Sequence, residues 1–81
     1  MTNALRIHPQ DSVVTVLHNV AAGSSIELGD GALPTPVVVR EAIPFGHKVA
    51  IRAIASGEHV IKYGSSIGVA VVDIQPGEHV H

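Results

Sequence analysis

Histidines are the residues of this sequence best suited to chemistry. The chain has six of them in 81 residues, and an imidazole can bind a metal ion, act as a general base or serve as a polar surface group. His79 and His81 lie two residues apart in a segment expected to be extended, so both side chains point to the same side of a strand. This pair can hold a cation or a carboxylate, or it can belong to a frayed chain end. The spacing alone leaves both interpretations open.

Two further places offer polar groups that could work with this pair. His47, like His79, comes shortly after a glycine in a segment expected to form a turn, and it joins His79 and His81 if the two turns pack together. Lys48 beside it offers a positive charge to a carboxylate. In the second place, Lys62 offers another positive charge, and the Tyr63 hydroxyl can donate a hydrogen bond or relay a proton. The alternative for this second place is a solvated lysine next to a half-buried aromatic ring.

The remaining sequence must position these side chains, and its most informative feature is a pattern that occurs four times. Each copy reads apolar, two residues, Gly, two residues, apolar, and the copies span residues 20–26, 43–49, 54–60 and 74–80. A glycine at the fourth place is typical of a tight turn with positive φ. Each copy therefore predicts the end of one strand, a turn and the start of the next strand. The copies are irregularly spaced, which excludes a solenoid of fixed period.

Short β-branched and apolar runs between the turns predict the strands. Residues 12–20 also fit a helical spacing, but their β-branched residues favour a strand. Residues 67–74 are almost wholly apolar, as a strand buried on both faces would be. The predicted strands are residues 12–17, 36–40, 48–54, 59–62 and 67–74.

Length, composition and charge limit the classes of protein. Residues 1–81 form one domain, whose small core makes association with another chain or domain a reasonable expectation. The absence of cysteine rules out disulfides and thiolate metal sites. A net charge of −2 argues against a nucleic-acid partner. No apolar run is long enough to span a membrane, and we expect a cytoplasmic protein.

Three segments, residues 43–50, 60–64 and 74–81, resemble the SAF domain of the altronate/galactarate dehydratase family. The opening residues 4–13 are also similar, so the resemblance covers nearly the whole chain. It implies an all-β fold, namely a small β-clip (antifreeze-like) domain with short strands and glycine turns. One departure is Ser65-Ser66, which stands where family members often carry a glutamate.

The resemblance also implies a function, which is the removal of water from a sugar acid by a lyase (a hydro-lyase of the altronate dehydratase type). This chain would be its small subunit or N-terminal domain, active only with a large catalytic subunit or domain. A divalent metal (Fe, Mn or Mg) would be held jointly by the two parts. The residues on the matching motifs are Lys48, Lys62 and Tyr63 for catalysis, His47, Lys48 and Lys62 for substrate binding, and His47, His79 and His81 for the metal.

Two alternatives stay open beside this hypothesis. The chain can be a non-catalytic SAF module for binding or assembly, or the small subunit of a sulfolactate sulfo-lyase, since that activity occurs in the same family. Formation of homo-oligomers also stays open. The partners expected from the leading hypothesis are the large subunit and the sugar acid.

Overall fold

The computed structural model describes residues 2–29, 33 and 35–80. This part of the chain consists of strands and turns and contains no helix. It therefore holds no helical segment of the length and apolar character that crossing a membrane requires. The sequence prediction of an all-β fold is confirmed.

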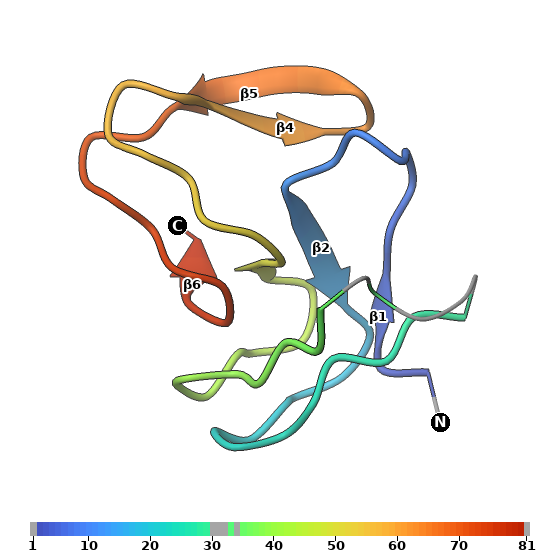
Figure 1. Ribbon diagram of the computed structural model, residues 1–81. Coiled ribbons are helices and arrows are strands. Elements are labelled where there is room, and N and C mark those ends of the chain that lie inside the picture. Colours follow the sequence, from blue (N-terminus) through green and yellow to red (C-terminus); the bar gives the residue numbers. More distant parts are fainter. Residues whose placement is uncertain (1, 30–32, 34, 81) are drawn as a thin grey trace.

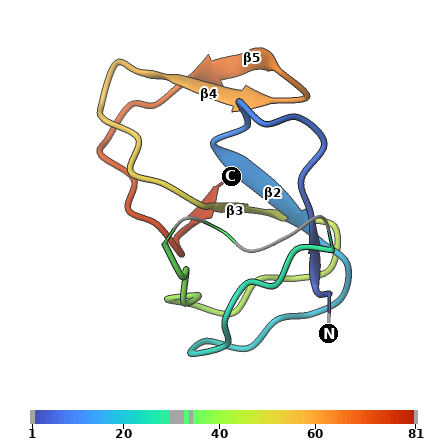
Figure 2. The same ribbon diagram turned by 45° about the vertical axis from the view of Figure 1, so that its right-hand side comes forward.

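Four of the strands form an antiparallel sheet, in the order β1-β2-β3-β6; Figure 1 labels β1, β2 and β6, and Figure 2 labels β3. These are β1 (Ala4–Leu5), β2 (Val13–Val16), β3 (Lys48–Ala50) and β6 (His79–Val80). The other two, β4 (His59–Lys62) and β5 (Ser65–Val69), form a hairpin that lies across one end of the molecule in both views (Figures 1 and 2). The hydroxyl of Ser12 joins the hairpin to the start of β2, because it accepts a 2.9 Å hydrogen bond from the N–H of Ile61.

The four-stranded sheet carries a small core on each face. Successive side chains of a strand point to opposite faces, so neighbours in β2 and β3 enter different cores. Val14 and Val49 belong to the first core, with Ile43 among its other members. Val13 and Ala50 belong to the second core, which the hairpin and β6 complete. All these side chains are buried, and their packing fixes the register of β3 against β2.

The four glycine turns are present as predicted. Gly23, Gly46, Gly57 and Gly77 have φ values of 89°, 82°, 88° and 91°. In each turn the N–H of the residue after the glycine donates a hydrogen bond to a carbonyl three residues earlier. The turns also associate in pairs, because isolated bridges join Val20 to Ile43 and Ile54 to Ile74.

Some strand boundaries differ from those predicted. The strand predicted at residues 59–62 is found, and that predicted at 12–17 is two residues shorter. The strand predicted at 48–54 ends at Ala50, because the chain then bends toward the next glycine turn. The strand predicted at 36–40 is wrong. That segment instead makes a single bridge, from Val38 to Ser25.

The largest difference concerns residues 67–74, which we predicted to be a strand buried on both faces. The strand here is β5, which ends at Val69, and all five of its residues are exposed. Beyond it, Val71 and Val72 are 87% and 62% exposed. In the described chain β5 pairs with β4 alone, so no second layer covers these apolar side chains.

Candidate functional site

The imidazoles of His47 and His79 meet at the edge of the four-stranded sheet. The Nδ1 atom of His47 lies 2.9 Å from Nε2 of His79, at hydrogen-bond distance, and the rings stack with centroids 5.1 Å apart. The strand register explains the contact. His79 of β6 stands opposite Val49 of β3, and His47 precedes Val49 by two residues, so the two histidines are diagonal neighbours on one face.

Lys48 belongs to the same place. Together with Gly46, His47 and Val80 it lines an open hollow of about 400 Å³. Lys48 is half-buried, since it is paired with Thr15 on one side and Val80 on the other. The hollow thus combines a lysine with the imidazole of His47, whose ring is fixed by its contact with His79, and this set can bind an anionic group and exchange protons with it.

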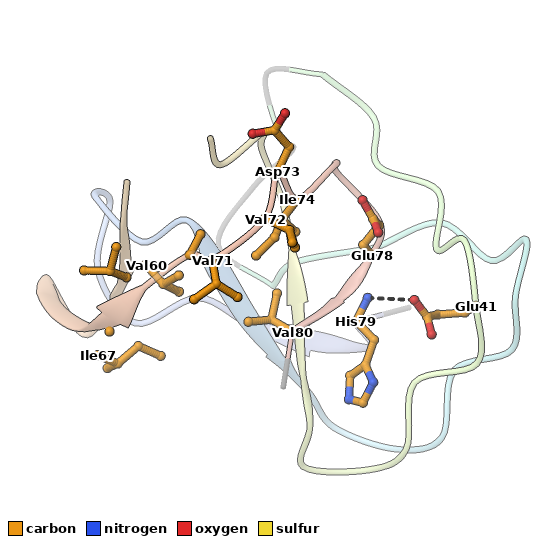
Figure 3. A pocket seen from close by; sticks show the side chains of 13 residues that line it. Glu41, Val60, Ile67, Val71, Val72, Asp73, Ile74, Glu78, His79 and Val80 are labelled. Carbon is orange, nitrogen blue, oxygen red and sulfur yellow. Dashed lines mark hydrogen bonds between the residues drawn. The ribbon is translucent and has the colours of Figure 1, made fainter. Parts of the chain in front are cut away.

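Glu41 is a member of the site that sequence reasoning missed. Its Oε2 accepts a hydrogen bond of 3.3 Å from the backbone N–H of His79 (Figure 3). The carboxylate therefore helps to hold β6, and it brings a negative charge close to the imidazole pair. No motif or spacing in the sequence singled out this residue.

The structure does not bring Lys62 and Tyr63 to the imidazole pair. The N–H of Val16, at the end of β2, bonds to the carbonyl of His47, whereas Ser12, before its start, bonds to Ile61 next to Lys62. The imidazole pair is thus at one end of β2, and Lys62 with Tyr63 is at the other. A four-residue strand separates these ends by about 13 Å. The Lys62 ammonium instead lies 4.7 Å from the centroid of the exposed Tyr63 ring.

Asp11 holds the turn that carries these two residues. Its carboxylate accepts hydrogen bonds from the N–H groups of Gly64 at 2.8 Å and His8 at 3.1 Å. Burial raises the pKa of Asp11, but hydrogen bonds from the backbone of Gly64, His8, Tyr63 and Ile7 outweigh it, so the pKa lies below its ordinary value of 3.8. Sequence reasoning missed this residue as well, because a single aspartate before a strand carries no signal.

The other described histidines have local partners. The Nδ1 atom of His8 accepts a hydrogen bond from the N–H of Gln10, and the Nδ1 atom of His18 lies 3.1 Å from the carbonyl oxygen of Asn19. His59 contacts the hydroxyl of Ser66 at 2.8 Å.

As a metal centre, this site offers two nitrogen donors from the described residues, His47 and His79. Within residues 2–29, 33 and 35–80 no group of three or more His, Cys, Asp or Glu side chains has the arrangement of a metal site. His81, the third predicted ligand, lies outside the described residues. Structural zinc takes four ligands and catalytic zinc three from the protein, so further ligands would have to come from elsewhere.

Comparison with known proteins shows sequence similarity over nearly the whole chain. The family model of the altronate/galactarate dehydratase SAF domain matches residues 2–81. Altronate dehydratase of Escherichia coli is 39% identical over 77 residues, which are 95% of this chain and 15% of that protein. Altronate dehydratase of Bacillus subtilis is 35% identical over 81 residues, which are 100% of this chain and 16% of that protein.

Another relative is itself a short polypeptide, and most of its length matches this chain. The (2R)-sulfolactate sulfo-lyase subunit alpha of Chromohalobacter salexigens is 42% identical in an alignment of 79 residues that covers 93% of this chain and 84% of that subunit. This chain thus spans a small fraction of the altronate dehydratases and most of the sulfo-lyase subunit. The all-β fold, the glycine turns and the match over nearly every residue agree, and the chain belongs to the altronate/galactarate dehydratase SAF-domain family.

Proposed function

We propose that this chain is the small, non-autonomous part of a hydro-lyase that removes water from a sugar acid. Its family membership supports the reaction class. The observation that carries the role of this chain is the contact between His47 and His79 at an open edge of the sheet. Such an edge suits a partial active site that a second, larger polypeptide completes.

Elimination of water from a sugar acid requires three catalytic functions. A base takes the proton from the carbon next to the carboxylate, positive charge stabilises the negative charge that develops on the carboxylate oxygens, and an acid protonates the leaving β-hydroxyl. The C–H and C–O bonds break, a C=C bond forms, and water departs. No oxidant or reductant is needed, so histidine and lysine side chains are suitable for every proton transfer.

Within this chain we assign these catalytic functions to residues of the hollow at the sheet edge. Lys48 would bind the substrate carboxylate, because its positive charge lies beside His47 in the same hollow. His47 would move protons, since its contact with His79 fixes the orientation of its ring. Lys62 and Tyr63, at the other end of β2, would contact a different part of the substrate or the larger polypeptide.

The alternative use of this pair is a shared divalent metal ion, for which His47 and His79 would be two nitrogen ligands in place of their mutual hydrogen bond, with His81 a third candidate. The larger polypeptide would supply the remaining ligands. Imidazole and oxygen ligands suit Fe, Mn or Mg. Such an ion, when bound, would stabilise negative charge on the substrate carboxylate as a Lewis acid.

The shape of the site supports a non-autonomous role. Ligand sites commonly bury most of their ligand in a cleft, whereas the hollow here is formed by only four residues of an exposed edge. A substrate in it would remain in contact with water on its outer side. The larger polypeptide is therefore needed to close the site.

A chimera tests this proposal. In it, this chain replaces the matching segment of the Escherichia coli altronate dehydratase. We expect the chimera to convert altronate or galactarate, and the isolated chain to convert neither. Turnover by the isolated chain would contradict the proposal, as would a folded chimera that converts neither acid.

A second candidate function is that of a sulfo-lyase small subunit, and one observation favours it. The chain covers 84% of the sulfolactate sulfo-lyase subunit alpha, against 15% of the altronate dehydratase. In that reaction the same proton abstraction would expel sulfite, so that a C–S bond breaks instead of a C–O bond. Replacing that subunit by this chain in the Chromohalobacter salexigens enzyme and measuring sulfite release from (2R)-sulfolactate separates the two candidates.

A further inference from the structure

The exposed apolar side chains around β5 border a groove, which we call the β5 groove. It has a volume of about 400 Å³, and its walls include residues of β4, β5, the segment after β5 and β6. Val60, Ala70 and Val80 are buried at 5–7% exposure, whereas Val71 and Val72 stand far out at 87% and 62%. Figure 3 shows these valines grouped together. Apolar side chains grouped on the surface in this way are typical of an interaction site.

The charged residues of the β5 groove all have one sign. Glu41, Asp73 and Glu78 line it, and none of the described residues lining it is a lysine or arginine. Backbone N–H groups hold the three carboxylates in place. The carboxylate of Asp73 accepts a hydrogen bond from the N–H of Ser56, and that of Glu78 accepts one from the N–H of Gln75. The carboxylate of Glu41 accepts one from the N–H of His79. The apolar groove is thus bordered by three carboxylates, and Figure 3 shows Glu41, Asp73 and Glu78 around the apolar side chains.

The β5 groove is continuous with the candidate site. His79 lines the groove, and its ring contacts His47 at the sheet edge. A polypeptide seated in the groove therefore lies directly beside the imidazole pair. This is the position that the missing walls of the active site would have to occupy.

Charge decides between a second copy of this chain and a different partner. A symmetric dimer through the groove would place the same patch against itself, so Glu41, Asp73 and Glu78 would face the same carboxylates of the other copy. Like charges across an interface oppose association. The groove therefore suits a partner that brings apolar side chains flanked by lysine or arginine.

We infer that the β5 groove is the surface on which the catalytic part of the lyase docks, through an apolar segment flanked by basic residues. The inference rests on the proposed function, because that function requires a larger partner. The length of the relatives supports this occupant, since this chain accounts for only 15% of the Escherichia coli altronate dehydratase. Most of such a protein lies outside this domain and has to contact it somewhere.

Cysteine labelling in the chimera described above tests this docking. The chain has no cysteine of its own, so Val71→Cys or Val72→Cys introduces a single reporter in the groove, and Leu5→Cys introduces a control on β1 at the opposite edge of the sheet. All three positions are exposed, so the substitutions leave the fold intact. Labelling rates are measured by mass spectrometry of the peptides, in the isolated chain and in the chimera.

We expect the groove reporters to be labelled about tenfold or more slowly in the chimera than in the isolated chain, because labelling then requires undocking. The Leu5→Cys control should react at similar rates in both proteins. Equal rates at the groove reporters, or protection at Leu5→Cys alone, would overturn the inference. So would slower groove labelling in the isolated chain at high concentration, which would identify a second copy as the occupant.

Altronate turnover by the same chimera separates this inference from the proposed function. Protection of the groove without turnover would leave the docking surface standing and count against the proposed chemistry. Turnover without protection would support the chemistry and overturn the docking surface. The two measurements are independent because no reporter lies among the proposed catalytic residues.

Discussion

The backbone N–H of Gly64 donates a 2.8 Å hydrogen bond to the carboxylate of Asp11, which lies 53 residues earlier in the chain. This bond ties the turn between β4 and β5 to the segment before β2. The turn includes Tyr63, whose φ of 57° lies in the left-handed region that residues other than glycine rarely adopt. The conformation of the turn therefore depends on an ionised carboxylate.

Replacing Asp11 should destabilise the protein in a pH-dependent way. Its folded-state pKa is lowered, so its stabilising contribution is present above the ordinary pKa of 3.8 and is lost as the pH falls through the lower folded pKa. We expect Asp11→Asn to reduce the free energy of unfolding by about 1–3 kcal/mol at pH 7. Urea unfolding at a series of pH values should show this difference shrinking below about pH 4.

The matched control for this variant is Asp73→Asn. Asp73 also accepts a backbone hydrogen bond, from Ser56, but it is exposed. Its replacement should cost less at every pH, because solvent can satisfy the N–H that it leaves. Equal losses in the two variants would contradict the special role of Asp11.

Gly77 should tolerate alanine far less than Gly57, although each glycine begins a Gly-Glu-His-Val sequence in its own turn. A β-carbon at Gly77 would lie 2.1 Å from the carbonyl oxygen of Val38, whereas one at Gly57 would meet no atom within 4 Å. Both have positive φ, so alanine at Gly57 should cost about 1–2 kcal/mol. Gly77→Ala should cost at least about 3 kcal/mol, since the backbone has to move as well. Thermal unfolding of the two variants checks this order.

His47→Ala should remove activity without removing the fold. In the chimera we expect kcat for altronate to fall by about 100-fold or more, the loss typical of a group that transfers protons. His47 is exposed, so the free energy of unfolding should change by no more than about 0.5 kcal/mol. His18→Ala, another exposed imidazole, is the control and should keep both properties. An active His47→Ala chimera would exclude the pair from the mechanism.

Metal binding by the isolated chain should be weak and confined to the imidazole pair. Titration with Mn²⁺, followed by NMR, should broaden the ring signals of His47 and His79 before those of His18 and His59. We expect low affinity because the described residues offer two donors where metal sites use more. The His79→Ala variant should lose the selective broadening at His47. Equal broadening at all histidines would argue against a site here.

The turns of this fold could be predicted from the sequence because their signal is local. A glycine flanked by apolar residues at fixed distances identified all four, and each has positive φ. The strand at residues 59–62 was also recognised correctly. The segment 67–74 was not, because an apolar run shows only that its side chains avoid water. It does not show whether this chain or another polypeptide covers them.

The candidate site was predictable only in part, for a related reason. His47 and His79 are both in recognisable turns, but their contact depends on the register of β3 against β6, which joins residues about thirty positions apart. Lys62 and Tyr63 looked equally suitable as chemical groups, yet β2 separates them from the pair. Glu41 and Asp11 act through backbone hydrogen bonds that no short pattern encodes.

The last strand, β6, spans two residues and pairs with β3 at the outer edge of the sheet. His79 therefore contacts His47 only while this short strand remains paired with β3. Peeling it away would disassemble the imidazole pair and withdraw Val80 from the second core, yet leave the first core untouched. Mild warming or denaturant that frays this strand should thus separate His47 from His79 well before the domain unfolds.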